Sequence, residues 1–135
     1  MTRFLLDSNA ITDLVRHPSG AVAQRIEEAG EDEVCTSIIV AAEVRYGVAK
    51  RGSAELRARC EAALGVLEVV PFASPGDAAY ARVRAALEST GQLIGANDML
   101  IAAHAIALGC TIVTDNEREF ARVGGLSCVN WMRER

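Results

Sequence analysis

Three carboxylates in this sequence stand beside short, largely apolar runs. Asp7 directly follows one run, Glu43 lies inside a second, and Asp98 begins a third. The runs span residues 3–6, 38–44 and 99–103. An ionised carboxylate is costly in apolar surroundings unless a cation compensates its charge. Three acids at the edge of the core therefore indicate a bound metal ion.

The chemistry of such a site follows from charge repulsion. Two carboxylates about 4 Å apart repel by roughly 4 kcal/mol at an effective dielectric constant of about 20. A whole domain is stabilised by only about 5–15 kcal/mol, so converging acids need either a proton or a divalent cation. Mg²⁺ and Mn²⁺ prefer oxygen ligands, and such an ion polarises a phosphoryl oxygen and activates water as a nucleophile. The pattern favours phosphodiester hydrolysis.

The composition predicts one ordinary globular domain spanning residues 1–135. Half of the residues are hydrophobic and only 4% are aromatic, so aliphatic side chains must form the core. This bias is typical of helices packed on a buried parallel sheet. A net charge of −4 argues against nucleic-acid binding by bulk attraction. Local basic residues, first among them Arg45, Lys50 and Arg51, are candidates to contact RNA or a protein partner, or simply to solvate the surface.

Strand-like and helix-like segments alternate along the chain. Strands are expected over 3–6, 34–37, 66–70, 111–114 and 126–130. Helices are expected from about 10 to the break at Pro18, and over 21–29, 38–50, 53–64, 74–90, 97–108 and 117–122. Asp7, Ser53, and either Asn97 or Asp98 are the expected N-caps. The alternation predicts a three-layer α/β/α fold with a mostly parallel sheet.

Ligands of such sheets bind beyond the carboxyl ends of the strands. Asp7 and the polar cluster at 114–116 follow strands, so both belong at that edge. Glu43 and Asp98 lie on expected helices that can present them to the same crevice. Each acid also has a purely structural interpretation. Asp7 could only cap a helix, Asp98 could only be stabilised by the helix dipole at a helix start, and Glu43 could form a salt bridge, for instance with Arg45.

Other reactive residue types are better explained by packing. The four cysteines are widely spaced and are expected to be free thiols in or near the core. His104 lies six positions after Asp98, on another face of the helix, and is expected to pack or cap, whereas His17 is expected to be exposed. Trp131 is expected to anchor the last strand. No signal peptide or membrane span is expected, which favours the cytoplasm.

Four motifs resemble those of the PIN-domain ribonucleases. The first is the segment 4–9, which ends Leu-Asp-Ser-Asn, and the second is 41–47, in which Glu43 is followed by Val-Arg-Tyr-Gly. The third is 94–104, which contains Asn-Asp-Met-Leu, and the fourth is 113–120, with Asn-Trp at 130–131 as the usual end. The likeness covers essentially the whole chain in order. It resembles most the VapC-type toxins of bacterial type II toxin–antitoxin pairs.

This resemblance implies an endoribonuclease that depends on Mg²⁺ or Mn²⁺ and cuts structured RNA, commonly tRNA or rRNA, leaving 5′-phosphate and 3′-hydroxyl ends. It implies that Asp7, Glu43 and Asp98 bind the metal. It also implies a homodimer and a VapB-like antitoxin whose C-terminal segment covers the active site.

The fourth motif departs from the family pattern. Many relatives carry a fourth acid two residues after the motif threonine, Thr114, where this chain has Asn116. Asn116 is therefore a candidate catalytic residue, and Asp115 and Glu119 are alternatives for the fourth ligand. Ser8 and Asn9 are expected to support the first motif, because second-layer hydrogen bonds orient metal ligands.

Two other functions remain open from the sequence. Phosphotransferases of the haloacid-dehalogenase type also place a nucleophilic aspartate after the first strand, but they need a second aspartate where this chain has Asn9. A catalytically silent RNA- or protein-binding module would also be compatible with the altered fourth motif.

Overall fold

The sheet is entirely parallel. The computed structural model describes residues 3–133, so residues 1–2 and 134–135 of the expected domain lie outside it. The strands are β1 (Arg3–Leu6), β2 (Val34–Ser37), β3 (Glu68–Val70), β4 (Cys110–Val113) and β5 (Cys128–Val129). Their order is β3-β2-β1-β4-β5, and every neighbouring pair is parallel. The prediction of a mostly parallel sheet is confirmed.

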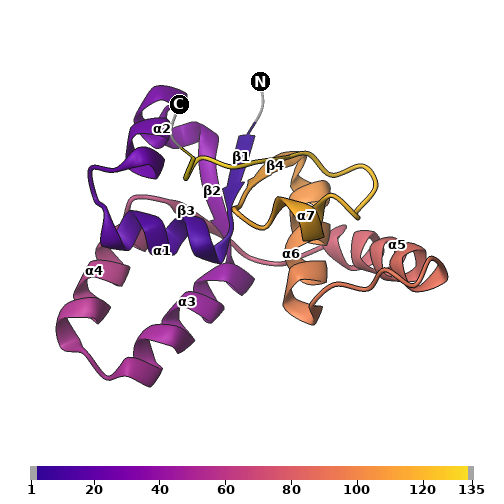
Figure 1. Cartoon of the computed structure of the whole chain (residues 1–135), viewed down its shortest axis with the longest axis horizontal. Coiled ribbons are helices and arrows are strands. Elements are labelled where there is room, and N and C mark those ends of the chain that lie inside the picture. Colours follow the sequence, from indigo (N-terminus) through magenta and orange to yellow (C-terminus); the bar gives the residue numbers. More distant parts are fainter. Residues whose placement is uncertain (1–2, 134–135) are drawn as a thin grey trace.

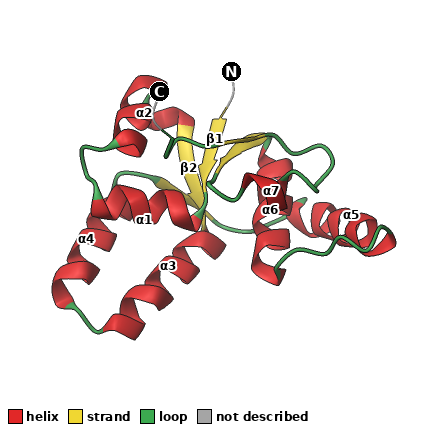
Figure 2. Ribbon diagram, viewed as in Figure 1, coloured by secondary structure: helices red, strands yellow, loops and turns green. Residues whose placement is uncertain are grey.

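Helices cover this sheet in two groups. One group comprises α1 (Ser8–Arg16), α2 (Ala21–Ala29), the short helix η1 (Glu31–Glu33), α3 (Ile38–Arg51) and α4 (Ala54–Gly65). The other contains α5 (Gly76–Ser89), α6 (Ala96–Leu108) and α7 (Glu117–Phe120). In Figure 1 the first group lies to one side of β1 and the second group to the other. Figure 2 shows the resulting α/β/α arrangement, and none of the described helices has the length and apolarity to cross a membrane.

Most expected elements are present, with errors at their ends. The helix 21–29 is confirmed residue for residue, and Ser53 caps α4 as expected. The strand expected over 126–130 is only Cys128–Val129, and that expected over 66–70 begins at Glu68 because α4 continues to Gly65. The prediction that Asn97 or Asp98 caps α6 is wrong. Gly95 occupies the cap, because an extended backbone there lets its carbonyl accept from the Met99 N–H.

The strand order reverses at β1, the central strand of the sheet. From β1 the chain adds β2 and β3 on one side, and later β4 and β5 on the other. Leu6 of β1 is in register with Val113 of β4, and the Asp7 N–H donates to the Val113 carbonyl at 2.9 Å. The residues that follow β1 and β4 are therefore adjacent at the carboxyl edge. Open α/β sheets bind ligands at such a switch point.

The core that supports this edge is aliphatic. Leu5, Leu6 and Ile112 are fully buried, in agreement with the shortage of aromatic residues. Trp131 is also buried, and its ring lies 4.8 Å from that of Phe4 of β1, centroid to centroid. The prediction that Trp131 anchors the chain end to the core is confirmed. The four cysteines are free thiols, and three of them are buried.

Ser37 and His104 form a buried polar contact between α3 and α6. Ser37 ends β2 and caps α3, because its hydroxyl oxygen accepts from the Ile39 N–H at 3.0 Å. The same oxygen lies 2.7 Å from Nδ1 of His104, and both residues are almost fully buried. Burial lowers the pKa of His104, which favours the neutral ring. His104 is a packing residue as predicted, and His17 is exposed at the end of α1.

We expect Ser37→Ala to lower the free energy of unfolding by about 2–4 kcal/mol in urea titrations. Loss of the cap costs about 1 kcal/mol, and a buried ring nitrogen left unpaired costs about 1–3 kcal/mol more. Ser53→Ala is the matched control, because Ser53 caps α4 at 3.1 Å from the Leu56 nitrogen but is exposed. It should cost only about 1 kcal/mol. Equal losses in the two variants would contradict a structural role for the contact with His104.

Candidate metal and nuclease site

Asp7 lies at the bottom of the candidate site. It follows β1 and caps α1, and only 4% of its surface is exposed. Its Oδ1 accepts from the Ser8 N–H at 2.8 Å, and its Oδ2 accepts from the Thr114 hydroxyl at 2.9 Å. Asn9 Nδ2 donates to the same Oδ2 at 3.3 Å. Burial raises the pKa of Asp7, the donors oppose this rise, and the charge of Glu43 adds to it.

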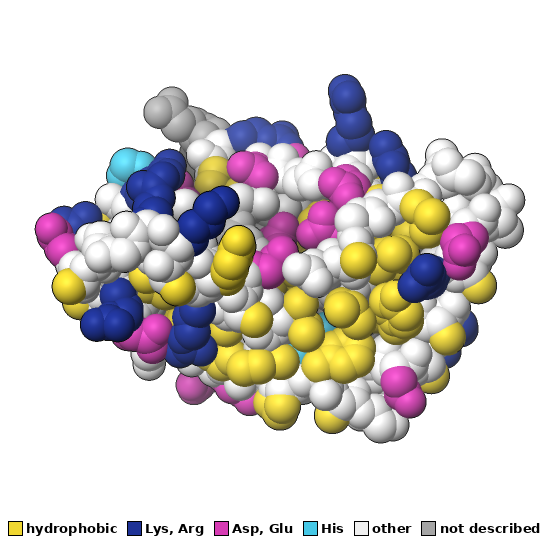
Figure 3. All heavy atoms as spheres, turned by 90° about the horizontal axis from the view of Figure 1, so that it is seen from below, with side chains coloured by type: hydrophobic (Ala, Val, Ile, Leu, Met, Phe, Trp, Pro, Cys, Tyr) yellow, Lys and Arg dark blue, Asp and Glu magenta, His cyan; other side chains and the backbone are white. Residues whose placement is uncertain are grey.

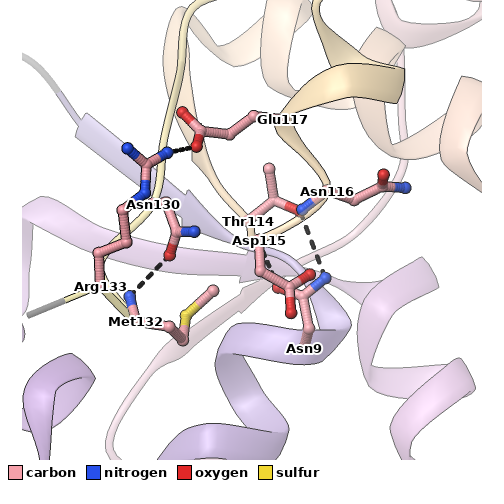
Figure 4. A network of polar contacts seen from close by, with 8 residues as sticks. All are labelled: Asn9, Thr114, Asp115, Asn116, Glu117, Asn130, Met132 and Arg133. Atoms are coloured by element: carbon pink, nitrogen blue, oxygen red, sulfur yellow. Dashed lines mark hydrogen bonds and ion pairs between the residues drawn. The ribbon is translucent and has the colours of Figure 1, made fainter.

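The loop after β4 is tied to the first motif through Asn9. Asn9 Nδ2 also donates to Thr114 Oγ1, and Asn9 Oδ1 accepts from the Asp115 N–H at 3.0 Å. Figure 4 shows this loop lying over Asn9, with the Asn116 side chain directed away from it. Thr114 Oγ1 in turn accepts from the Asn116 N–H at 3.0 Å. The supporting role expected of Asn9 agrees with these contacts, and Thr114 takes part in them.

Glu43 reaches the same edge from α3. Its Oε1 accepts from the Ser8 hydroxyl at 2.7 Å, and its Oε2 accepts from Asn97 Nδ2 at 3.3 Å. Glu43 therefore joins the first and third motifs. The alternative pairing with Arg45 is wrong, because Arg45 binds Glu61 of α4 through Nε and Nη2 at 3.0 and 2.9 Å.

Asp98 lies in the first turn of α6, where acidic charge converges. Its pKa is raised to about 7, first by burial and then by the negative charges of Asp7 and Glu119, with Glu43 adding to the rise. The structure therefore brings the three sequence-predicted acids close enough to interact. Their mutual repulsion raises the energy of the ionised acids, as expected from the sequence.

Glu119 is the fourth acid of this cluster. Its Oε1 accepts from the Gly95 N–H at 2.9 Å, and its Oε2 accepts from Asn116 Nδ2 at 2.6 Å. These two hydrogen bonds are the main reason that its pKa is lowered, and the charge of Arg122 contributes. Asn116 thus lies beside an acid that is three residues further along the chain. Asp115 is exposed, and its backbone N–H makes its contact with the site.

Two site residues were not predicted individually. Asn97 donates to Glu43, and Gly95 donates to Glu119. A Cβ atom at Gly95 would lie 3.2 Å from Asp98 Oδ2, so the missing side chain leaves room for that carboxylate. Both residues belong to the third motif. Their position within the three residues before Asp98 was the available signal.

The donor set suits a hard divalent cation. Carboxylate oxygens of four acids face one edge, together with hydroxyl and amide oxygens, and Mg²⁺ and Mn²⁺ prefer such ligands. Among residues 3–133, no three His, Cys, Asp and Glu side chains are arranged to hold one ion between them. The carboxylate oxygens of Asp7 and Glu43 instead accept hydrogen bonds from Ser8, Thr114 and Asn97. Mg²⁺ typically needs only one or two carboxylates and retains several waters, so the set fits.

The predicted basic stretch is only partly available. Arg45 is paired with Glu61, and Arg59 with Glu55 at 3.0 Å. Lys50 and Arg51 are exposed in the last turn of α3. Arg51 also lines a groove of about 250 Å³ that runs between α1, α3 and α4 and begins at Ser8 and Glu43.

Figure 3 shows how charge is distributed around this edge. Acidic side chains lie near the middle of the face. Basic side chains gather on the half that contains α1 to α4, and apolar side chains gather on the half that contains α5 and α6. The exposed apolar residues of the chain include Ile38 and Leu93.

Fold and site together define an α/β/α domain with an acidic crevice at the switch point of a parallel sheet. The family model of the PIN domain matches residues 4–126. Ribonuclease VapC2 of Rickettsia felis is 35% identical over 130 residues, which are 95% of this chain and 97% of that protein. The tRNA(fMet)-specific endonuclease VapC of Shigella flexneri is 31% identical over 132 residues, covering 97% and 99% of the two chains.

Solved structures give the same result. The crystal structure of VapBC2 from Rickettsia felis bound to a DNA fragment from its promoter matches with a TM-score of 0.89 and 31% identity, covering 96% of this chain and 99% of that one. DNA-bound VapBC from Salmonella typhimurium matches with a TM-score of 0.87 and 28% identity, covering 97% and 99%. The chain therefore belongs to the PIN-domain family, in its VapC-type branch.

In the presence of a metal chelator, we expect Asp98 to destabilise the folded protein as the pH rises. Its pKa is raised from 3.8 to about 7 on folding, so the folded state binds the proton more tightly. The resulting stability is complete below the unfolded pKa and is lost as the pH rises through the folded value. Asp98→Asn should therefore be more stable than the parent by about 1 kcal/mol at pH about 8 and nearly equal at pH about 4, after allowance for solvent screening.

Urea unfolding of both proteins in EDTA tests this pH dependence. The control is Asp32→Asn, which removes an acid from the exposed turn η1. A difference between Asp98→Asn and the parent that does not change with pH would show that the acids do not converge electrostatically.

Proposed function

We propose that this protein is the toxin of a type II toxin–antitoxin pair and acts as an endoribonuclease that depends on Mg²⁺ or Mn²⁺ and cleaves structured RNA, such as tRNA or rRNA. The observation that carries the proposal is the position of Asp98 beside Asp7, Glu119 and Glu43, where its pKa is raised to about 7. Relatives named as ribonucleases, one of them specific for tRNA(fMet), support the same reaction class.

Asp7, Glu43 and Asp98 would hold the ion, with waters completing its coordination. Bound Mg²⁺ or Mn²⁺ supplies charge stabilisation at a phosphoryl oxygen and lowers the pKa of water. Ser8 fixes Glu43 through its hydroxyl, and Asn9 and Thr114 fix Asp7. Such outer hydrogen bonds orient ligands and commonly change metal affinity or activity by about 10–100-fold. Glu119, held by Gly95 and Asn116, adds negative charge beside Asp98.

Hydrolysis forms one bond from a water oxygen to phosphorus and breaks the bond from phosphorus to O3′. The leaving oxygen takes up a proton, so the products carry 5′-phosphate and 3′-hydroxyl ends. His104 is buried and its Nδ1 contacts Ser37, and His17 is exposed at the end of α1. The described site therefore offers carboxylates rather than a histidine to accept the proton of the attacking water.

The alternative of an aspartate nucleophile is less well supported. Asp7 is 4% exposed, and both of its oxygens already accept hydrogen bonds. The position two residues later is Asn9, which donates to Asp7 and to Thr114. Neither feature favours in-line attack by Asp7 on a phosphate.

We expect Asp7→Asn, Glu43→Gln and Asp98→Asn each to lower the rate of RNA cleavage by at least about 100-fold, because each removes charge that holds the ion. The measurement is cleavage of total tRNA and rRNA with Mg²⁺ or Mn²⁺, followed by mapping of the new 5′ ends. Asp77→Asn, in the exposed first turn of α5, is the control and should keep nearly full activity. Full activity in Asp98→Asn would refute the proposed site. A parent that cuts no RNA once freed of antitoxin would favour the silent binding module.

A VapB-like antitoxin is the proposed partner, because structural relatives are VapBC complexes. We propose that its C-terminal segment lies in the groove that begins at Ser8 and Glu43, where Val44 and Leu56 offer apolar contacts and Arg51 offers a charge. The inactive Asp98→Asn variant should still bind the antitoxin, because this groove is lined by α1, α3 and α4. Co-purification with the product of the adjacent reading frame measures this binding.

We also propose a homodimer, in which the exposed apolar residues beside the site are covered by a second copy. Ile38 is 41% exposed and Leu93 is 48% exposed, although both are large and apolar. Light scattering should give about twice the 14.4 kDa mass of the chain. A mass that stays at one chain over a broad concentration range would contradict the dimer.

A further inference from the structure

A second groove lies on the other side of the acidic cluster. It has a volume of about 370 Å³ and is bounded by α5, the end of α6 and the segment after α7. Its floor is aliphatic, with Val83 and Leu87 buried, and its rim is polar. The rim carries two arginines and two uncharged polar residues, namely Arg82, Arg122, Thr90 and Gln92. A volume in this range is enough for a small ligand or about one nucleotide.

Arg122 connects this groove to the nuclease site. Its backbone N–H donates to the Glu119 carbonyl at 3.2 Å, and its Nη1 donates to the Leu93 carbonyl at 3.3 Å. Two residues after Leu93, the Gly95 N–H donates to the Glu119 carboxylate. The groove therefore begins where the acidic cluster ends, and a chain that leaves the cluster past Glu119 meets Arg122 first.

The two arginines of the rim are free to bind an anion. Within residues 3–133, Arg82 has no carboxylate partner, and Nη1 of Arg122 contacts only a neutral carbonyl. By contrast, Arg84 of the same helix is held by Tyr80 and Glu88. Among the described residues the groove therefore retains two guanidinium groups that form no ion pair, although the charge of Arg122 still acts on Glu119.

An RNA nuclease with an acidic centre needs such groups outside it. The phosphates that flank the cleaved bond are repelled by Asp7, Glu43, Asp98 and Glu119, except where the metal ion neutralises them. Backbone affinity must then come from cations at a distance of a nucleotide or more. Guanidinium groups bind phosphate oxygens with paired, charge-assisted hydrogen bonds. The groove has no aromatic ring for base stacking, so phosphate contact is the contribution it can make.

We infer that this groove is a phosphate-binding subsite for the RNA strand that leaves the active site past Glu119, with Arg122 holding a nearer phosphate and Arg82 a more distant one. The inference rests on the proposed ribonuclease function and names the residues that the RNA strand contacts after it leaves the active site. Gln92 and Thr90 lie where they can contact the sugar or the base edge of the same nucleotide.

The test measures RNA binding apart from cleavage. In the Asp98→Asn background, the Kd for a fluorescently labelled single-stranded RNA of mixed sequence is measured over a series of salt concentrations. We expect R82A/R122A to weaken binding about tenfold and to reduce the slope of log K against log salt by about 1.4, since each phosphate contact contributes about 0.7. R82K/R122K keeps both charges and should restore most of the slope.

R25A/R57A is the matched control, because it removes the half-buried Arg25 of α2 and the exposed Arg57 of α4 and changes the net charge equally. It should leave the slope within experimental error. Equal effects in the two double variants would overturn the subsite in favour of bulk attraction. Unchanged RNA binding with weakened antitoxin binding in R82A/R122A would overturn it in favour of a protein-docking surface.

The same series separates this inference from the proposed function. If the parent binds and cleaves RNA while R82A/R122A behaves like R25A/R57A, the subsite is wrong and the nuclease stands. If the parent neither binds nor cleaves RNA, both are wrong. Thermal unfolding of each variant confirms that the double substitutions leave the fold intact.

Discussion

The buried carboxylate of Asp7 is the constraint on which the site depends. It follows the central strand, and it is held by the Ser8 backbone and by the side chains of Asn9 and Thr114. A buried charge is tolerated only when its hydrogen bonds are made, so the ends of β1 and β4 must stay together. That requirement brings the first and fourth motifs into contact. Repulsion from Asp7 also contributes to the raised pKa of Asp98.

The rest of the fold positions the other acids against this point. Ser8 joins Asp7 to Glu43 of α3, and Asn97 joins Glu43 to α6. The contact between Ser37 and His104 fixes the same two helices deeper in the core. The acidic cluster is thus supported by hydrogen bonds between elements, while aliphatic packing supplies most of the burial. This division explains why the site can concentrate negative charge without losing its geometry.

The acids are gathered in one cluster, whereas the arginines are spread around it. Several arginines are neutralised by local carboxylates, including Arg45 and Arg59. Other arginines, beside the two grooves that flank the acids, form no ion pair within residues 3–133. Although the net charge is −4, positive side chains are concentrated beside the two grooves. Recognition of an anionic substrate depends on which guanidinium groups remain unpaired, rather than on the total charge.

The sequence alone determined the fold class and the strand and helix order, and it singled out the three acids as candidates, because apolar periodicity and the order of the motifs are local properties of the chain. It could not determine helix and strand ends, such as the start of α6 at Ala96 after its cap Gly95, because these depend on backbone hydrogen bonds. Nor could it show that Arg45 pairs with Glu61 rather than Glu43, or that Asn97 and Gly95 serve the site. Only the tertiary structure decided these pairings, because a side chain's partner depends on which distant segments the packed sheet brings within hydrogen-bonding distance.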